Sequence, residues 1–313
     1  METRLIDTEP RISVVVPAWN SEHTIVATVQ ALLMQTSPAD EIIVVNDGST
    51  DRTVEVLTRF GDLITVISRP NGGPAAARNT GVALASGEMI AFTDSDCIPE
   101  RGWLASLVEG FKSSESGQIA GVGGIVRGTG GSLTGEYADL IQLLDPVSGP
   151  DGEIPYVITA NACYRRGILL AAGLFDEGFQ RPGGEEAELG YRLRLAGYRF
   201  NLAPNALVYH HHRDSTSELI KTLINYGRGA GRIAFLWPER RIEDPLSLML
   251  RQLVSPRAIL RRLRQRLTVH GLRRGLYFAL LDHLRHPAFL LGYWLEHRLE
   301  TDTSTDQRHH SLL

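Results

Sequence analysis

Short apolar runs alternate with amphipathic segments along the first hundred residues of this chain. The runs are rich in β-branched residues, which is typical of strands that are buried on both faces of a sheet. The segments between them carry apolar residues at helical spacing. This order predicts an α/β fold with a mostly parallel central sheet and helices on both faces. The predicted strands are 12–19, 41–47, 62–69 and 88–96, and the predicted helices are 24–35, 53–60 and 73–87.

The rest of the chain is less regular until Ser215, after which it becomes helical. Between 117 and 212 the sequence is rich in Gly and Pro, and the predicted elements are strands at 119–128, 156–164 and 200–213 and a helix at 185–197. No internal repeat is visible. The predicted organisation is a domain over 1–214 with halves at 10–115 and 116–214, a helical extension over 215–300 and a disordered tail over 301–313.

Charge is spread unevenly over these parts. Residues 240–300 hold twelve arginines against five acidic residues, a net charge of +7. Residues 301–313 carry −1, so the whole-chain charge of −4 leaves −10 for residues 1–239. An acidic body of this kind gives no reason to expect a nucleic-acid partner. The basic extension needs an explanation of its own.

Composition places the chain among globular proteins, at 43% hydrophobic and 22% charged residues. Two cysteines, Cys97 and Cys163, do not suggest a disulfide framework. No apolar run reaches the length of a signal peptide or a membrane span. We therefore expect a cytoplasmic protein, either free or held peripherally on the inner face of the membrane.

Polar side chains follow three of the predicted strands, where ligands of parallel sheets bind. Trp19 and Asn20 follow the first strand, Asp47 ends the second, and Asp94 and Asp96 end the fourth. These residues should therefore share one edge of the sheet. Asp47 either belongs to an ordinary strand–turn–helix cap or accepts hydrogen bonds from a nucleobase.

The pair Asp94 and Asp96 ends a buried strand, and an ionised carboxylate is costly to bury unless it is paired or binds a cation. Mg²⁺ and Mn²⁺ prefer oxygen ligands and often share them with substrate phosphates. The alternative is an Asx turn. A later strand ends in three histidines, and alternation sends His210 and His212 to one face and His211 to the other. They are either surface histidines or one completes a metal or phosphate shell.

Two helix starts carry further candidate chemistry. Gly72–Gly73 leads into a helix whose N-terminus can face an anion, and Arg78 within that helix is either solvated or directed at the anion. The helix predicted at 185–197 begins with Glu185, Glu186 and Glu188. Acidic residues there are favoured by the helix dipole, and a glutamate is also suited to act as a general base.

In order, these stretches resemble inverting family 2 glycosyltransferases with a GT-A fold, over two-thirds to three-quarters of the chain. The matching motifs are VVVPAWN, VVNDGSTD, NGGPAAARN, FTDSD, ITANACYRRG, GLFDEGF, GGEEAEL and VYHHHR. The resemblance implies Mg²⁺- or Mn²⁺-dependent transfer of a sugar from a nucleotide-diphosphate sugar, most commonly a UDP-sugar, to an acceptor hydroxyl. The acceptor would be a glycan, a lipid-linked sugar or a small molecule, in cell-surface polysaccharide, glycolipid or related synthesis.

The resemblance also implies a role for each matched residue. The nucleobase pocket would be lined by Pro17, Ala18, Asn20 and Asp47. Arg78 would lie near the nucleotide or pyrophosphate, and Asp94 near the ribose or the metal. The metal ligands would be Asp96 and Asp94, joined by His210. Asn161 would help shape the sugar and acceptor region.

Glu186 matches the acid that serves as the catalytic base in this family. The family commonly shows Glu-Asp at this point, whereas this chain has Glu185-Glu186. The longer side chain moves the carboxylate, and catalysis is sensitive to such positioning. Either the acceptor is seated differently, or Glu185 or Glu188 shares the role.

Two rival functions are a nucleotidyltransferase and a sugar-nucleotide-binding protein that has lost activity. The first would need a Gly-rich phosphate loop after the first strand, and PAWNSEHT is not one. The second is opposed by the intact TDSD and left open by Glu186.

The basic extension allows two interpretations. The segment 258–267 carries leucines on one helical face and arginines largely on the other. A peripheral membrane contact through 240–300 is one interpretation, favoured by the aromatic residues Tyr277, Tyr293 and Trp294. The other is a helical bundle with a solvated arginine face.

Overall fold

The computed structural model describes residues 10–112, 116–145, 153–212, 214–239 and 256–310. Its chain contacts form two compact units. The first, here called the sheet unit, comprises Met1–Arg127, Leu144–Gln180 and Glu186–His211. The second, the helical unit, comprises Gly128–Leu143, Arg181–Glu185 and His212–Leu313. The helical unit thus takes two segments from within the domain predicted over 1–214.

The sheet unit is built on one eight-stranded sheet with the order β3-β2-β1-β4-β7-β6-β8-β5. Four strands at one side, β3, β2, β1 and β4, are parallel, and β7 then pairs antiparallel with both β4 and β6. The predicted α/β fold with helices on both faces is confirmed, and the sheet is mixed. The strands are β1 (Ile12–Ala18), β2 (Glu41–Asp47), β3 (Thr65–Arg69), β4 (Met89–Thr93), β5 (Cys97–Pro99), β6 (Ile119–Gly128), β7 (Asn161–Arg165) and β8 (Arg199–His210).

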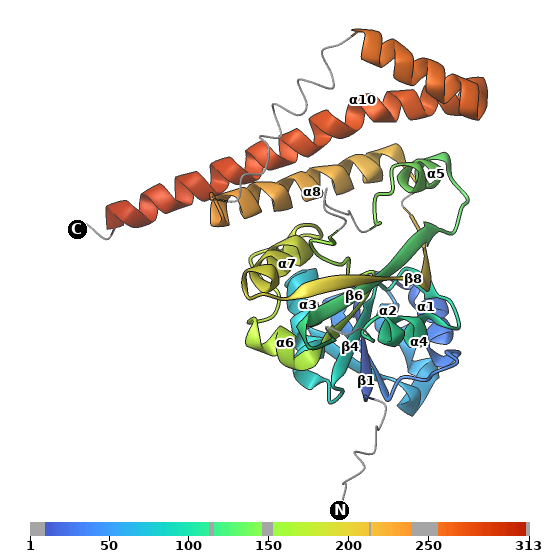
Figure 1. The fold of residues 1–313 in the computed structure, drawn as a ribbon, viewed down its shortest axis with the longest axis vertical. Helices are drawn as coiled ribbons and strands as arrows, with labels where there is room; N and C mark the ends of the chain where they lie inside the picture. The colour runs from blue at the N-terminus through green and yellow to red at the C-terminus, as the bar shows by residue number, and fades with distance from the viewer. Residues whose placement is uncertain (1–9, 113–115, 146–152, 213, 240–255, 311–313) are drawn as a thin grey trace, which may run out of the picture. The chain divides into compact units, whose positions relative to one another are not determined.

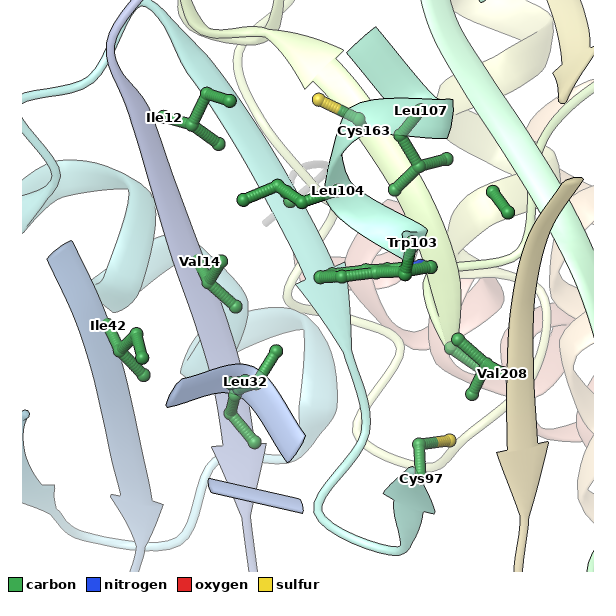
Figure 2. Close-up of a cluster of buried hydrophobic side chains, with 14 of the residues drawn as sticks. Ile12, Val14, Leu32, Ile42, Cys97, Trp103, Leu104, Leu107, Cys163 and Val208 are labelled. Carbon is green, nitrogen blue, oxygen red and sulfur yellow. The ribbon is translucent and has the colours of Figure 1, made fainter. Parts of the chain in front are cut away.

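Side chains of β1 alternate between two hydrophobic cores, one on each face of the sheet. Val14 and Val16 contribute to the core beneath α1, α2 and α4, where Trp103 is fully buried (Figures 1 and 2). Val15 contributes to the opposite core beneath α3, α6 and α7. The helices are α1 (Ile25–Leu33), α2 (Thr53–Leu57), α3 (Pro74–Leu84), α4 (Trp103–Glu109), α6 (Arg166–Ala171) and α7 (Glu185–Leu195), with 3-10 turns η1 (Thr58–Leu63) and η2 (Ser116–Gln118).

Two elements near the candidate site were not predicted from the sequence. β5 has only three residues, and its pairing with β8 sets Cys97 opposite His210. α4 follows it and buries Trp103 and Leu104. A strand this short carries no periodicity of its own, and its extended conformation depends on the distant partner strand.

The helical unit consists of α5 (Leu133–Leu140), α8 (Thr216–Leu236) and α10 (Pro256–His310). α10 is interrupted at Gly271, whose φ of 75° breaks the helical path. α8 and α10 lie side by side, and a core that includes Tyr137, Leu219, Leu223 and Phe278 joins the three helices (Figure 1).

Residues 301–310 belong to α10, whereas the sequence predicted a disordered tail from 301; residues 311–313 lie outside the described part of the chain. Within the described residues, no helix combines the length and the apolar character needed to cross a membrane.

Candidate active site

Three loops meet at the carboxyl ends of β1, β2 and β4. Asn20 follows β1 in the left-handed conformation, with φ of 51°. Its amide nitrogen donates to Oγ of Ser49 at 2.9 Å, and its Oδ1 accepts from the amide of Thr50 at 2.8 Å. The hydroxyls of Ser21 and Ser95 lie 2.7 Å apart. These bonds hold the loop after β1 against the loop after β2 and against the Asp94–Asp96 turn.

The predicted nucleobase residues lie at this edge. Pro17 and Ala18 are the last two residues of β1 and pair with Val45 and Asn46 of β2. Trp19 follows with 59% of its surface exposed. An exposed indole next to two strand ends offers a flat apolar surface to a ligand.

Asp47 is buried, and its carboxylate organises the following glycine loop. It accepts hydrogen bonds from the backbone amides of Gly72 and Gly73 and from the guanidinium of Arg69. The distance from Gly73 N to Oδ2 is 2.8 Å. In this geometry Asp47 fixes the entrance to α3, and its contact with a nucleobase stays a prediction.

Arg78 and Asp94 form an ion pair at the end of β4. Nη2 of Arg78 lies 3.1 Å from Oδ1 of Asp94, and the arginine side chain is only 5% exposed while that of Asp94 is 30% exposed. Arg78 also lies over the ring of Phe175. The buried guanidinium therefore holds a carboxylate that remains partly open to solvent.

Asp96, Cys97 and His210 form a cluster that could hold a metal ion. Nε2 of His210 lies 3.4 Å from Oδ1 of Asp96, and the backbone amide of His211 donates to the carbonyl oxygen of Asp96 at 2.9 Å. Burial, reinforced by Asp96 and Asp94, raises the pKa of the Cys97 thiol well above its usual value. Mg²⁺ and Mn²⁺ prefer harder ligands than sulfur, so the candidate donors for such an ion are the carboxylate and the imidazole.

The two other histidines of the run differ from His210. β8 ends at His210, so strand alternation does not continue through the run. His211 is exposed. His212 is buried in the helical unit, where its Nε2 lies 3.0 Å from Oδ1 of Asp139.

Asn161 is 1% exposed and uses its amide inside the protein. Its Oδ1 accepts from the indole nitrogen of Trp103 at 2.7 Å, and its Nδ2 donates to the carbonyl oxygens of Ile125 and Ala206. The side chain thus joins β7 to β6, β8 and α4. The role of Asn161 in the sugar and acceptor region stays a prediction, and in this geometry the side chain would act there by holding these elements together.

The three glutamates at the start of α7 have different surroundings. Glu188 is buried and paired with Arg192 at 2.7 Å, and Glu185 is buried and accepts from the amide of Gly183. Glu186 is partly exposed, and Thr159 is its hydrogen-bond partner among the described residues. Glu186 is therefore the member best able to accept a proton from a substrate.

Thr159 also relates Glu186 to the strand ends. It lies two residues before β7, whose first residue, Asn161, pairs with Thr93 at the end of β4. The hydroxyl of Thr93 donates to the carbonyl oxygen of Ala160 at 3.0 Å. Glu186 thus lies at the same end of the sheet as the Asp94–Asp96 turn.

Sequence reasoning missed four residues that build this site: Ser21, Arg69, Ser95 and Thr159. Ser95 stands between the two aspartates, so its position offered a signal. Thr159 and Arg69 offered none, because their partners are 27 and 22 residues away along the chain.

The profile of the family described as "Glycosyl transferase family 2" matches residues 13–170. Among curated relatives, the pre-mycofactocin glycosyltransferase of Mycobacterium tuberculosis is 34% identical over 209 residues, which cover 64% of this chain and 43% of that protein. Glycosyltransferase AglE of Haloferax volcanii is 29% identical over 233 residues, which cover 72% of this chain and 74% of that protein. The chain thus spans less than half the length of the mycobacterial relative.

Among solved structures, the chain is similar to a mannosyltransferase from Pyrobaculum calidifontis in complex with GDP-Man and Mn²⁺. The TM-score is 0.64, with 20% identity over 94% of this chain and 87% of that chain. At this identity the likeness concerns the fold alone, and that fold is GT-A. Because the profile match covers half of the sequence and includes the ends of β1, β2 and β4, the chain belongs to glycosyl transferase family 2.

Proposed function

We propose that this protein transfers a sugar, with inversion, from a nucleotide-diphosphate sugar to an acceptor hydroxyl. The observation that carries the proposal is the placement of a partly exposed carboxylate, Glu186, at the same end of the sheet as the Asp94–Asp96 turn. Solved structures with similar folds include complexes with GDP-Man and Mn²⁺ and with UDP, GalNAc and Mn²⁺, which supports a nucleotide-sugar donor.

The residues of the cluster fit a hard divalent cation such as Mg²⁺ or Mn²⁺. Adjacent ligands of an octahedral ion at about 2.1 Å lie about 3 Å apart, and the Asp96 and His210 donor atoms are 3.4 Å apart. Asp94 follows β4 directly, two residues before Asp96, and its side chain is partly exposed. When bound, the cation would neutralise charge on the leaving diphosphate. Asp96 and His210 would hold it, with Asp94 facing it or the ribose.

Glu186 is the proposed base. Its carboxylate takes the proton of the acceptor hydroxyl, and the hydroxyl oxygen forms a bond to the anomeric carbon from the side opposite the diphosphate. The bond between that carbon and the diphosphate oxygen breaks, and the nucleoside diphosphate leaves with the bonding electrons. Thr159 donates to Oε1 of Glu186, so Oε2 is the proposed proton-accepting oxygen.

The donor pocket is proposed to use the end of β1 and the residues after it. Pro17, Ala18, Asn20 and Asp47 would surround the nucleobase, and Arg78 would act on the diphosphate through Asp94 or directly. UDP-sugars are the first donors to test. The acceptor class is a glycan, a lipid-linked sugar or a small molecule in glycoconjugate synthesis.

Calorimetry with UDP, GDP and dTDP, each with and without Mn²⁺, tests the donor site. Tight Mn²⁺-dependent binding of one diphosphate, lost in Asp96→Ala, is expected. Turnover of the matching sugar nucleotide should fall by about 10²–10⁴ in Glu186→Gln with diphosphate binding unchanged, whereas Glu55→Gln on the exposed side of α2 should behave as wild type. Binding without any turnover in the wild type would instead favour the sugar-nucleotide-binding protein.

A further inference from the structure

The second segment of α10, after Gly271, carries a row of leucines on its outer side, whereas Leu281 of the same segment is buried. Leu276, Leu280, Leu284, Leu291 and Trp294 are between 37% and 54% exposed, and Pro287 between them is exposed as well. Their spacing of three or four residues places all six on one helical face. We call these six residues the outer apolar face. From Leu276 to Trp294 it extends for about 27 Å, at 1.5 Å per residue.

The inner side of the same helix combines buried apolar residues, such as Phe278 and Leu281, with two acids that are paired inside the helical unit. Asp282 is 3% exposed and accepts hydrogen bonds from Arg266 at 2.8 Å and from the hydroxyl of Tyr137 at 2.9 Å. Further along, Glu296 pairs with Arg228 of α8 at 2.9 Å. The helix therefore has apolar residues on two sides: Phe278, Leu281 and Ala288 pack inward in the core of the helical unit, whereas the outer apolar face is exposed. An exposed apolar surface of this size marks a contact surface.

The charges around the outer apolar face are positive. Arg273 precedes it and Arg298 follows it, with the Arg298 guanidinium carbon 5.3 Å from the centre of the Trp294 ring. Arg261 and Arg264 are exposed on the first segment of α10. The acidic residues described between 259 and 300 are Asp282, Glu296 and Glu300, and each is in an ion pair with an arginine.

An apolar face surrounded by arginines favours one kind of binding partner. A second copy of the chain would bring the same arginines against one another, and like charges at a contact are unfavourable. A surface that offers hydrocarbon for the leucines and anionic groups for the arginines satisfies both features. Tryptophan at the end of an apolar face is typical of the boundary between lipid headgroups and acyl chains.

We propose that the outer apolar face of α10 lies in the headgroup region of an anionic lipid bilayer. The helix rests in the plane of the surface, because its inner side is occupied by α8 and by the Arg266–Asp282 pair. The flanking arginines contact lipid phosphates. This inference does not depend on the proposed glycosyl transfer, because it concerns binding to lipid alone.

The three aromatic residues that the sequence suggested for a membrane contact have different surroundings in the structure. The Tyr277 hydroxyl lies 2.7 Å from the hydroxyls of both Thr134 and Thr216, so it is used inside the helical unit. Tyr293 has its backbone against Gly227 and Gly231 of α8. Of the three aromatic residues that favoured a membrane contact in the sequence, Trp294 alone is on the outer apolar face.

Sedimentation of the full chain with phosphatidylcholine vesicles, with and without phosphatidylglycerol, tests the proposal. The wild type should bind the anionic vesicles, and its partition coefficient should fall at least about tenfold in Leu280→Gln/Leu291→Gln, because burial of two leucines is lost. The matched control is Leu63→Gln/Leu195→Gln, whose leucines are 64% and 63% exposed in the sheet unit and should leave binding unchanged. Circular dichroism of each variant verifies folding.

A charge variant, Arg261→Gln/Arg273→Gln, should lower anionic vesicle binding about tenfold or more, since each arginine near the surface contributes about fivefold. The Trp294 contribution to fluorescence, taken as the difference from Trp294→Phe, should shift to the blue with anionic vesicles. The proposal is overturned if the wild type does not bind anionic vesicles or if the leucine variant binds as well as the wild type. A wild-type dimer that becomes a monomer in the leucine variant, without vesicle binding, would assign the face to a second copy instead.

Discussion

The hydroxyl oxygen of Thr159 lies 2.7 Å from Oε1 of Glu186, and the backbone amide of Thr159 lies 3.3 Å from the same oxygen. One residue thus fixes the first turn of α7 to the loop that precedes β7. A hydrogen bond to an ionised carboxylate is shorter and stronger than one between neutral groups. The longer side chain of Glu186, compared with the aspartate common at this point in the family, is therefore held at a defined position.

Thr159→Val should lower kcat about tenfold or more, because a hydrogen bond to a charged group contributes about 1.5–3 kcal/mol. Steady-state kinetics with the sugar nucleotide identified by calorimetry would measure it. KM for the donor should stay near the wild-type value, and Thr159→Ser should restore most of kcat. If Thr159→Ser is as slow as Thr159→Val, the hydroxyl does not position the base.

His210→Ala should weaken Mn²⁺-dependent binding of the nucleoside diphosphate by at least about 10- to 100-fold, because loss of a residue that only supports a metal ligand already costs about this much. The reason is that one of the two candidate donor groups of the cluster is removed while Asp96 remains. Calorimetry in Mn²⁺ and in chelator measures the effect. His211→Ala, next to it and exposed, is the control. Equal Mn²⁺ dependence in both variants would remove His210 from the metal site.

Gly292→Ala should destabilise the helical unit. A Cβ at this position would meet the carbonyl oxygen of Ile224 and would lie 2.9 Å from the amide nitrogen of Arg228, so α8 and α10 would have to separate. Forced overpacking typically costs about 1–3 kcal/mol. Thermal unfolding measures the change. Gly167→Ala in α6, where a Cβ meets no atom within 4 Å, should be neutral or slightly stabilising. Similar melting of both variants would contradict the close helix contact.

Acid should weaken the helical unit through His286. Burial, together with the neighbouring Arg285, lowers the pKa of His286 to about 4 from its ordinary 6.5. Nε2 of His286 accepts a hydrogen bond from Arg285, which requires the neutral ring. Between pH 6.5 and 4 the unfolded chain binds the extra proton, so stability falls as the pH is lowered through this window.

The loss should be about 1–2 kcal/mol after allowance for the partial exposure of the ring. Urea unfolding at several pH values measures it, and His286→Asn should remove this part of the pH dependence. Asp282 adds a loss in the same direction: burial raises its pKa, but hydrogen bonds from Arg266 and Tyr137 outweigh burial and lower it. Comparing the wild type with His286→Asn separates the His286 contribution to the pH dependence from that of Asp282. An unchanged pH profile in that variant would exclude His286.

Local patterns predicted the strand–helix alternation of the sheet unit and the edge where its polar residues gather. Strands β1, β2, β4 and β6 and helices α3 and α7 lie where the apolar spacing placed them. The sequence did not predict what occupies the carboxylate of Asp47 or the amide of Asn161, since both are bonded to groups far along the chain.

The sequence by itself indicated which residues are candidates for the chemistry: the acids after β4, the glutamates at the start of α7 and the histidines at the end of β8. Tertiary structure decided what each can do. It assigned Glu188 to Arg192 and left Glu186 with Thr159, and it brought His210 to Asp96 by pairing β8 with the unpredicted β5. It also left the outer apolar face of α10 exposed by packing the other side of that helix on α8. Periodicity shows that a helix has an apolar face, but only the long-range packing partner determines whether that face is covered.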